Sequence, residues 1–181
     1  GGVYGSILVL FTILYMLTIL LMEKKDKEIY KGLSDTDALT GLFNRRAFQA
    51  AVDETLLKRI AGIFIFIDVD NFKDYNDKYG HANGDLCLKH FAAAMKKCFP
   101  KDSILGRYGG DEFVVYIKNA ASDDAHRYMD EFQREISHLM MSGGEHVTVS
   151  ASAGGVAFIG EGEDFVSLCR SADNMLYDVK R

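Results

Sequence analysis

The chain has 181 residues, of which 48% are hydrophobic and 26% are charged, and its formal net charge is −5. This length fits one compact domain with an additional segment, and the scattered basic residues argue against an extended nucleic-acid groove. The three cysteines lie far apart and lack the paired spacing of a zinc site, so we expect buried, reduced thiols.

The N-terminal run over residues 3–22 contains no charged side chain. About 20 apolar residues in a helix span roughly 30 Å of hydrocarbon, and the basic leader and cleavage site of a signal peptide are missing. We therefore expect residues 1–22 to form one transmembrane helix. Four lysines follow the run between residues 24 and 31, and excess lysine marks the cytoplasmic side. The sequence predicts a single-pass protein of the cell (inner) membrane, with the remaining domain in the cytoplasm.

Residues 23–36 are charged and permit a helix that continues from the membrane. Such a segment could pass motion or partner contact to the domain, and it could equally be a solvated spacer. Turn and cap residues such as Gly41 and Asn44 then interrupt the helix, and we place the globular domain at residues 37–181. Because the chain opens directly into the apolar run and stops at Arg181, we expect a fragment whose last domain is truncated.

Within the domain, the pattern of apolar residues predicts helices and strands in alternation. The strand in residues 62–70 is apolar on both faces, which is typical of a central strand. We expect, in order, a helix (45–60), this strand, two helices (72–80 and 83–99), a hairpin (103–108 and 113–117), a helix (122–141), a strand (146–158) and a helix (164–180). This order predicts an α/β fold, an α+β sandwich whose sheet holds parallel and antiparallel neighbours.

Helical spacing also predicts which side chains share a face. In the first helix of the domain we expect one apolar face made of Phe48, Val52, Leu56 and Leu57. In the helix that starts near residue 122 we expect Ser122 as the N-cap and an apolar face made of Tyr128, Phe132, Ile136 and Leu139.

Two pairs of acidic residues lie at the ends of two predicted strands. Asp68 and Asp70 end the central strand, and Asp111 and Glu112 begin the second hairpin strand. If the two strands are neighbours, these carboxylates meet at one edge of the sheet. Clustered carboxylate oxygens suit Mg²⁺ or Mn²⁺, which bind one or two carboxylates together with substrate phosphates. Taken alone, each pair is a weak signal, and Asp68 with Asp70 is read more simply as a polar strand end.

Groups suited to a nucleotide lie beside these acids. Gly109 and Gly110 form the tight hairpin loop, where we expect positive φ and room for a ligand. The helix that follows Asp68 offers unpaired N–H groups, which attract phosphate. Asn76 and Asp85 supply an amide and a carboxylate, the pair of groups needed to read a guanine edge.

Four motifs together carry a resemblance that no single one would carry. They are "DALTGLFNRRAF" at residues 37–48, "FIDVDNFKDYNDKYGHANGD" at 66–85, "GGDEF" at 109–113 and "ADNMLYDVK" at 172–180. In this order they resemble the GGDEF family of diguanylate cyclases. The resemblance implies a fold similar to class III nucleotidyl cyclases and a nucleotidyltransferase that condenses two GTP molecules into cyclic di-GMP with release of two pyrophosphates.

The resemblance also implies roles for individual residues. Asp68, Asp111 and the backbone carbonyl of Val69 would hold two Mg²⁺ (or Mn²⁺) ions per GTP. Asp111 would also deprotonate the attacking 3′-hydroxyl, and Glu112 would complete the acidic site. Because each domain would hold one GTP, the active species is expected to be a homodimer.

The remaining implied roles concern substrate binding. They fall on a phosphate loop (Asn71, Phe72, Lys73), a guanine-reading pair (Asn76, Asp85), the two loop glycines (Gly109, Gly110) and a lysine that grips the terminal phosphates (Lys180).

The chain departs from the family pattern at two places. Pro100 and Ser103 occupy the positions of an Arg-x-x-Asp inhibitory product site, so we expect no such feedback. An arginine that often follows the terminal lysine lies beyond Arg181, which leaves the activity of this fragment open.

Two alternatives are kept beside the cyclase. One is a degenerate domain that binds GTP or a protein without catalysis, although its usual losses, at Asp68, Asp111 or Glu112, are not seen here. The other is a cyclase for a different purine, against which Asp85 argues.

Overall fold

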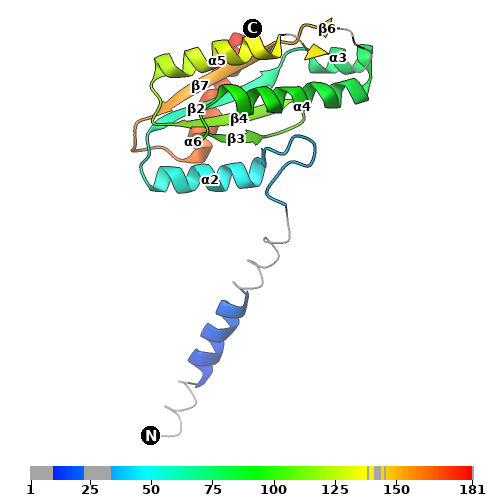
Figure 1. Ribbon diagram of the computed structural model, residues 1–181. Helices are drawn as coiled ribbons and strands as arrows, with labels where there is room; N and C mark the ends of the chain where they lie inside the picture. The colour runs from blue at the N-terminus through cyan, green and yellow to red at the C-terminus, as the bar shows by residue number, and fades with distance from the viewer. Residues whose placement is uncertain (1–9, 23–33, 138, 141–143, 145, 181) are drawn as a thin grey trace, which may run out of the picture. The chain divides into compact units, whose positions relative to one another are not determined.

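Five strands form a mixed sheet at the centre of the fold, in the order β1-β3-β4-β2-β7 (Figure 1). The parallel pair is β1 with β3, and every other neighbouring pair is antiparallel. The strands are β1 (Phe43–Asn44), β2 (Gly62–Val69), β3 (Ile104–Arg107), β4 (Glu112–Lys118) and β7 (Ala151–Phe158). The prediction of a mixed sheet with the 62–70 strand near its centre is confirmed.

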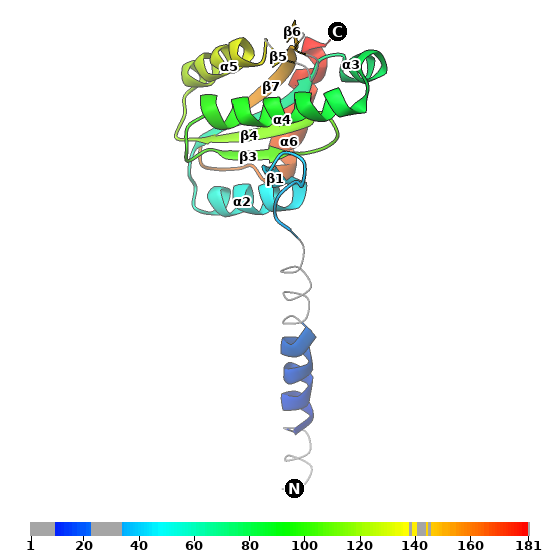
Figure 2. The same cartoon turned by 45° about the vertical axis from the view of Figure 1, so that its right-hand side comes forward.

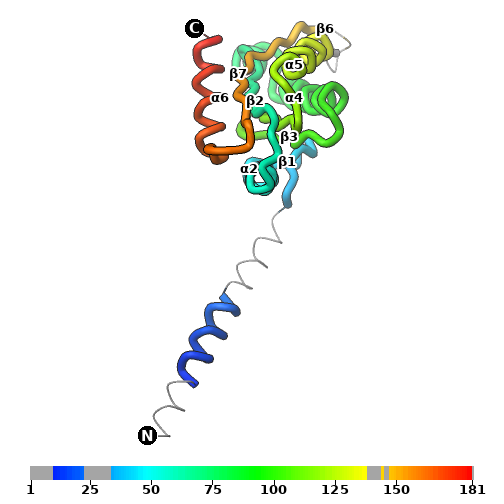
Figure 3. Tube along the Cα trace, turned by 90° about the vertical axis from the view of Figure 1, so that its left-hand side faces the viewer, coloured from blue at the N-terminus to red at the C-terminus, as the bar shows by residue number. Residues whose placement is uncertain are grey.

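Helices cover both faces of this sheet. Figure 3 shows α4 and α5 on one side of it and α6 on the other, and α2 packs with α6 in the same core. The helices are α2 (Arg45–Leu57), α3 (Phe72–Tyr79), α4 (His81–Cys98), α5 (Ser122–Ile136) and α6 (Phe165–Val179). Two short strands, β5 (Leu139–Met140) and β6 (His146–Val147), pair separately.

The molecule is a computed structural model that describes residues 10–22, 34–137, 139–140, 144 and 146–180. The chain divides into two compact units, Gly1–Ser34 and Asp35–Arg181. The described part of the first unit is a helix over residues 10–22, and its side chains are exposed. Among the residues described, no helix is both long and apolar enough to cross a membrane. The rest of the predicted span (residues 1–9) and the segment 23–33 lie outside the described residues.

The alternation of side chains along β2 builds two separate cores. Ile63, Ile65 and Ile67 pack with α4 and α5, whereas Phe64 and Phe66 pack with α2 and α6. Side chains that alternate across a strand reach opposite faces of the sheet, so a strand covered on both sides must be apolar at every position. This is the physical reason for the uninterrupted apolar run in the sequence.

The ends of several elements differ from the predictions. The N-cap of α5 is Ala121, not Ser122, and the Ala121 N–H donates to the Asp124 carboxylate (3.3 Å). The helix ends at Ile136, so Leu139 lies in β5 and not on the helical face. The expected strand over residues 146–158 is divided into β6 and β7.

The predicted face of α2 is correct for three of its four members. Phe48, Val52 and Leu56 are buried, but Leu57 is 85% exposed. Positions 56 and 57 are adjacent and point about 100° apart on a helix with 3.6 residues per turn, so only one of them can face the sheet.

Helix α6 lies unusually close to the backbone of β7 at Gly154. A Cβ atom at this position would lie 2.2 Å from the Ala172 carbonyl oxygen and 2.4 Å from the Leu176 nitrogen. Both neighbours are backbone atoms of α6, so neither can move aside by a rotamer change. At the next position, Gly155, the nearest atom to an added Cβ would be 3.7 Å away.

We expect Gly154→Ala to lower the free energy of unfolding by roughly 1 to 3 kcal/mol, because overpacking against backbone forces α6 away from the sheet. The matched control is Gly155→Ala, which adds the same methyl group in ordinary contact distance and should change stability by less than about 0.5 kcal/mol. Urea unfolding followed by circular dichroism measures both. Equal losses for the two variants would contradict the close approach at Gly154.

Candidate functional site

The ends of β2 and β4 bring acidic residues together. Asp68 is the register partner of Glu112 in the antiparallel pair of strands. Asp111 directly precedes Glu112, and its carbonyl accepts a hydrogen bond from the Val69 N–H (3.2 Å). The Asp68 side chain is only 18% exposed. The two acid-bearing strand ends therefore lie side by side, as the sequence predicts for neighbouring strands.

Burial and mutual repulsion perturb these carboxyl groups. Burial raises the pKa of Asp68, and the charges of Asp111 and Asp70 raise it further, while a hydrogen bond and the charge of Lys180 act in the opposite direction. The pKa of Glu112 is raised by burial and by Asp68 and Asp111. Negative charge is thus concentrated here beyond what the fold neutralises, as expected of a site for a cation.

Lys180 supplies a positive charge at this cluster. It follows α6 directly as the C-cap residue, and its Nζ donates a hydrogen bond to Asp68 Oδ1. Figure 2 shows the C-terminal end of α6 at the same end of the domain as α3, which begins shortly after β2. The ammonium group therefore occupies a position where a cation can contact Asp68.

These residues fit a divalent ion that also binds a substrate. Over the described ranges, no three His, Cys, Asp or Glu side chains are grouped as a metal-ligand set. A tightly held structural ion would need such a set, whereas Mg²⁺ commonly binds through one or two carboxylates and completes its shell with water and phosphate. Asp68, Asp111 and the main-chain oxygen of Val69 match the second kind of site.

Asp70 lies close enough to Asp68 to raise its pKa, but its own oxygens are already hydrogen-bonded. Its two carboxylate oxygens accept hydrogen bonds from the hydroxyls of Ser150 and Ser152 (2.6 Å each), and its N–H donates to the Ser150 carbonyl (3.0 Å). Asp70 directly follows β2, and its charge acts on Asp68, as the predicted acidic strand end implies. Its hydrogen bonds join the end of β2 to the segment that leads into β7.

The hairpin turn between β3 and β4 is closed by backbone bonds. The N–H groups of Tyr108 and Gly109 both donate to the Glu112 carbonyl (2.8 and 3.3 Å). Neither Gly109 nor Gly110 has positive φ, so the expectation that this loop needs left-handed glycines is wrong. The space around the two glycines differs: a Cβ at Gly109 would lie 2.4 Å from Glu112 Oε2, whereas a Cβ at Gly110 would meet no atom within 4 Å.

The predicted phosphate loop lies at the start of α3. Asn71 is the N-cap, with left-handed backbone (φ 53°) and no hydrogen bond from its side chain to the helix. Phe72 and Lys73 form the first turn, and Lys73 is exposed. N–H groups at a helix start attract phosphate when no side chain caps them, so the local geometry is compatible with the predicted role.

The predicted guanine-reading residues lie where α3 packs against α4. The Asn76 side-chain oxygen is buried and has no hydrogen-bond partner. It lies against Gly84, where an added Cβ would be 1.9 Å away. Asp85 follows Gly84 and is exposed. Asn76 is carried by α3 and Asp85 by α4, and α3 begins three residues after the end of β2.

Four residues near the turn are not found by reasoning from the sequence. Arg107 and Asp37 form a partly buried ion pair (3.1 Å), and the Arg45 guanidinium lies over the Tyr108 ring, 4.4 Å from its centroid. All four residues line a hollow of about 390 Å³ beside Gly109 and Gly110. The available signal was the arginine two positions before the double glycine in "GRYGG".

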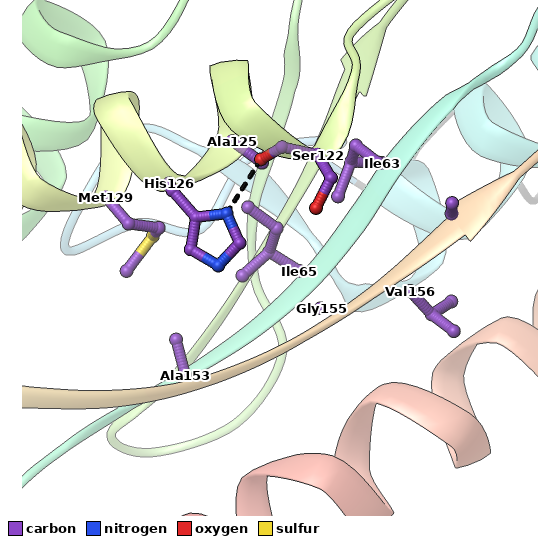
Figure 4. Close-up of a pocket in the computed structure, with 10 residues that line it drawn as sticks. Ile63, Ile65, Ser122, Ala125, His126, Met129, Ala153, Gly155 and Val156 are labelled. Atoms are coloured by element: carbon purple, nitrogen blue, oxygen red, sulfur yellow. Dashed lines mark hydrogen bonds between the residues drawn. The ribbon is translucent and has the colours of Figure 1, made fainter.

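A second hollow, of about 270 Å³, lies under α5 and has a different character (Figure 4). It is lined mainly by apolar residues of α5, β2 and β7, and none of the lining residues is acidic. His126 Nδ1 is hydrogen-bonded to the Ser122 carbonyl (2.9 Å). This hollow contains none of the residues predicted to bind nucleotide or metal.

Comparison with known proteins places these features in a family. Residues 34–181 match the model of the diguanylate cyclase GGDEF domain. Two relatives come from Escherichia coli K12: the cyclic di-GMP phosphodiesterase PdeR is 32% identical over 87% of this chain and 24% of its own length, and the diguanylate cyclase DgcM is 31% identical over 87% and 39%. The chain thus spans well under half the length of these relatives.

A solved structure confirms the fold. The GGDEF domain of DgcB from Caulobacter crescentus, determined in complex with c-di-GMP, superposes with a TM-score of 0.74 at 30% identity. The match covers 81% of this chain and 88% of that chain.

We expect Asp68→Asn and Asp70→Asn to change stability in opposite directions. The raised pKa of Asp68 means that its ionised form opposes folding at neutral pH, so Asp68→Asn should leave stability at or above wild type. Asp70→Asn weakens two hydrogen bonds from serine hydroxyls and should cost roughly 1 to 3 kcal/mol.

Urea unfolding without divalent ions, repeated at several pH values, measures both effects. The advantage of Asp68→Asn should shrink as the pH falls through the raised pKa of Asp68, because the wild-type carboxylate then becomes neutral. A destabilised Asp68→Asn at neutral pH would contradict the charge crowding described here.

Proposed function

Because the chain belongs to the GGDEF domain family, we propose that it is a diguanylate cyclase that condenses two GTP molecules into cyclic di-GMP and two pyrophosphates. The observation that carries the proposal is the meeting of Asp68, Asp111 and Glu112 at adjoining strand ends. The family match alone does not decide the activity, since one of its relatives is named a phosphodiesterase and another a diguanylate cyclase.

In this proposal the acidic cluster binds divalent ions and handles one proton. Asp68, Asp111 and the Val69 carbonyl would hold two Mg²⁺ (or Mn²⁺) ions per GTP, which would supply positive charge to the triphosphate and to the developing alkoxide. Asp111 accepts the proton of the 3′-hydroxyl. The 3′-oxygen bonds to the α-phosphorus of the second GTP, the bond from that phosphorus to the bridging oxygen breaks, and pyrophosphate leaves. The same step from the 3′-oxygen of the second GTP to the α-phosphorus of the first closes the ring and releases the second pyrophosphate. Glu112 lies beside Asp68 and adds a further carboxylate to the same site.

The phosphates are held by groups on either side of the cluster. The first turn of α3, from Asn71 to Lys73, offers backbone N–H groups and one cation. Lys180 already contacts Asp68, so its ammonium is close enough to the cluster to hold the terminal phosphates once the ions occupy the carboxylates. Gly109 and Gly110 leave space for the nucleotide to pass over the turn.

Guanine recognition is assigned to Asn76 and Asp85. A buried oxygen without a partner costs free energy in the folded protein, and Asn76 carries one. A purine amino or imino group would satisfy that oxygen, and the exposed Asp85 carboxylate would accept from a neighbouring N–H group. Such a pair selects guanine over adenine, because adenine has no N1–H or N2 amino group.

Each domain presents one set of these groups, and the product contains two guanosines. Two copies must therefore face one another, with the 3′-hydroxyl of one GTP directed at the α-phosphate of the other. The active species in this proposal is a homodimer. At the positions of the inhibitory product site stand Pro100 and Ser103, which cannot supply an arginine or a carboxylate.

The decisive experiment incubates the protein with GTP and Mg²⁺ and separates the nucleotides. We expect cyclic di-GMP, a specific activity that falls on dilution, and no product from ATP. Asp111→Asn should reduce turnover by at least about 100-fold, because it removes both a proton acceptor and a metal ligand, while the variant remains folded. The control is Asp102→Asn, an exposed acid beyond the other end of β3.

Bound but unconverted GTP would favour the alternative, a degenerate domain that acts as a GTP-binding or protein-interaction module. Undiminished turnover in Asp111→Asn would show that the proposed metal and base assignments are wrong.

We further propose that residues 3–22 anchor the chain in the cell (inner) membrane as a single pass, with the catalytic domain in the cytoplasm. The support is the uncharged apolar run followed by lysines. The protein should stay with isolated membranes through high-salt and alkaline-carbonate washes and be released by detergent. Deletion of residues 3–22 should release it to the supernatant, whereas release of the intact chain by salt alone would contradict the anchor.

A further inference from the structure

The motif at residues 37–48 has no chemical role in the proposed function, yet its first residue forms a tight local structure. We call residues 37–42 the Asp37 turn. Asp37 Oδ1 accepts hydrogen bonds from the N–H (2.9 Å) and hydroxyl (2.6 Å) of Thr40. The Asp37 backbone bonds with Gly41 and Leu42 (2.8 Å each). The turn is therefore closed on itself at the first residues of the folded domain.

Arg107 of β3 reaches this turn from a position 70 residues later in the chain. Its Nη1 donates to both carboxylate oxygens of Asp37 (3.1 and 3.2 Å). The side chains are 15% and 23% exposed. Burial alone would raise the pKa of Asp37, but the hydrogen bonds from Thr40 and Arg107 outweigh it and hold the pKa below its usual value. The pair is therefore fully charged at neutral pH.

The other side of the same guanidinium holds the catalytic turn. Arg107 Nε and Nη2 both donate to the Gly110 carbonyl (3.1 and 2.7 Å). The next residue is Asp111, whose own carbonyl is held by the Val69 N–H (3.2 Å). The backbone that carries the Asp111 side chain is thus fixed by a hydrogen bond at each of two successive carbonyls.

Backbone bonds from Tyr108 and Gly109 close the turn, but Gly110 itself has little packing. No atom would lie within 4 Å of a Cβ at this residue, and Gly110 is exposed. Glycine loses more conformational freedom on ordering than any other residue, so a double glycine without packing would sample many conformations. A planar guanidinium with two donors on one oxygen is suited to suppress this freedom, and a lysine ammonium is not.

We propose that Arg107 is a positioning residue for the reaction: anchored on Asp37, it fixes the Gly110 carbonyl and thereby the backbone that presents Asp111. The inference rests on the proposed function only where it predicts a change in kcat. The ordering of the turn is a property of the protein without substrate and is tested separately.

The test uses the whole chain and two substitutions. Arg107→Lys keeps the positive charge but removes the planar guanidinium that bonds Asp37 and Gly110 at the same time. Asp37→Asn keeps a side-chain oxygen for Thr40 but removes the negative charge that pairs with Arg107. The matched control is Asp35→Asn, two residues away, which removes the exposed ion pair with Arg46 (side chains 65% and 41% exposed). Exposed pairs of this kind contribute little, so the control should behave as wild type.

The first measurement is hydrogen exchange of peptides that span residues 107–113, without nucleotide. We expect both test variants to exchange faster there by about tenfold or more, because charge-assisted hydrogen bonds to the turn are lost. Exchange in the core of β2 should be unchanged. Unchanged exchange in the turn would overturn the inference, whatever the activity of the protein.

The second measurement is steady-state kinetics well below the unfolding temperature. We expect kcat to fall by about tenfold or more, with KM for GTP within about twofold of wild type, since misplacement of a reacting group acts on the chemical step. Faster exchange with an unchanged kcat would overturn the positioning role.

The two measurements separate this inference from the proposed function. If the wild-type protein makes no cyclic di-GMP, the proposed function fails, while exchange still decides whether Arg107 orders the turn. If Arg107→Lys does not fold, Asp37→Asn provides the same comparison.

Discussion

The antiparallel register between β2 and β4 is the constraint on which the rest of the structure depends. It pairs Asp68 with Glu112 and, at the same time, sets Ile63 to Ile67 against the apolar residues of β4. A shift by one residue would turn every β2 side chain to the opposite face of the sheet, so each would face the other core, and Asp68 would no longer be paired with Glu112. The register that packs the two cores is therefore also the register that assembles the acidic cluster.

Burial of the core and ionisation of the acids make opposite demands on these strand ends. The core excludes water, whereas ionised carboxylates are stabilised by water, and the pKa values of Asp68 and Glu112 are raised as a result. Lys180 offsets part of the repulsion between these carboxylates. Its ammonium is carried by a flexible side chain, so a divalent cation can displace it from Asp68. Asp70, just after the end of the same strand, is instead satisfied by two serine hydroxyls.

The sequence predicted those features that depend on local pattern or on one long apolar strand. The element order, the central strand and the meeting of Asp68 with the 111–112 pair follow from periodicity and from the ends of strands. Features set by distant parts of the chain could not be predicted in this way. Arg107 meets Asp37 across 70 residues, and the pairing of Asp70 with Ser150 and Ser152 needs the position of β7.

Other errors arose where two physical explanations fit one pattern. A double glycine fits both a left-handed turn and a need for space, and only the backbone angles distinguish them. Leu56 and Leu57 both fit an apolar face, and the helix phase decides between them.

The contact of α6 with Gly154 also bears on how a charge is delivered to the acidic cluster. Backbone atoms of Ala172 and Leu176 lie directly against this glycine, so only a residue without a Cβ allows α6 to approach this closely. Lys180 follows Ala172 by eight positions, roughly 12 Å along the helix axis, and ends at Asp68. The absence of a methyl group at residue 154 thus fixes how closely α6 approaches β7. A larger residue there would displace α6 and shift the Lys180 ammonium relative to Asp68, without touching either side chain.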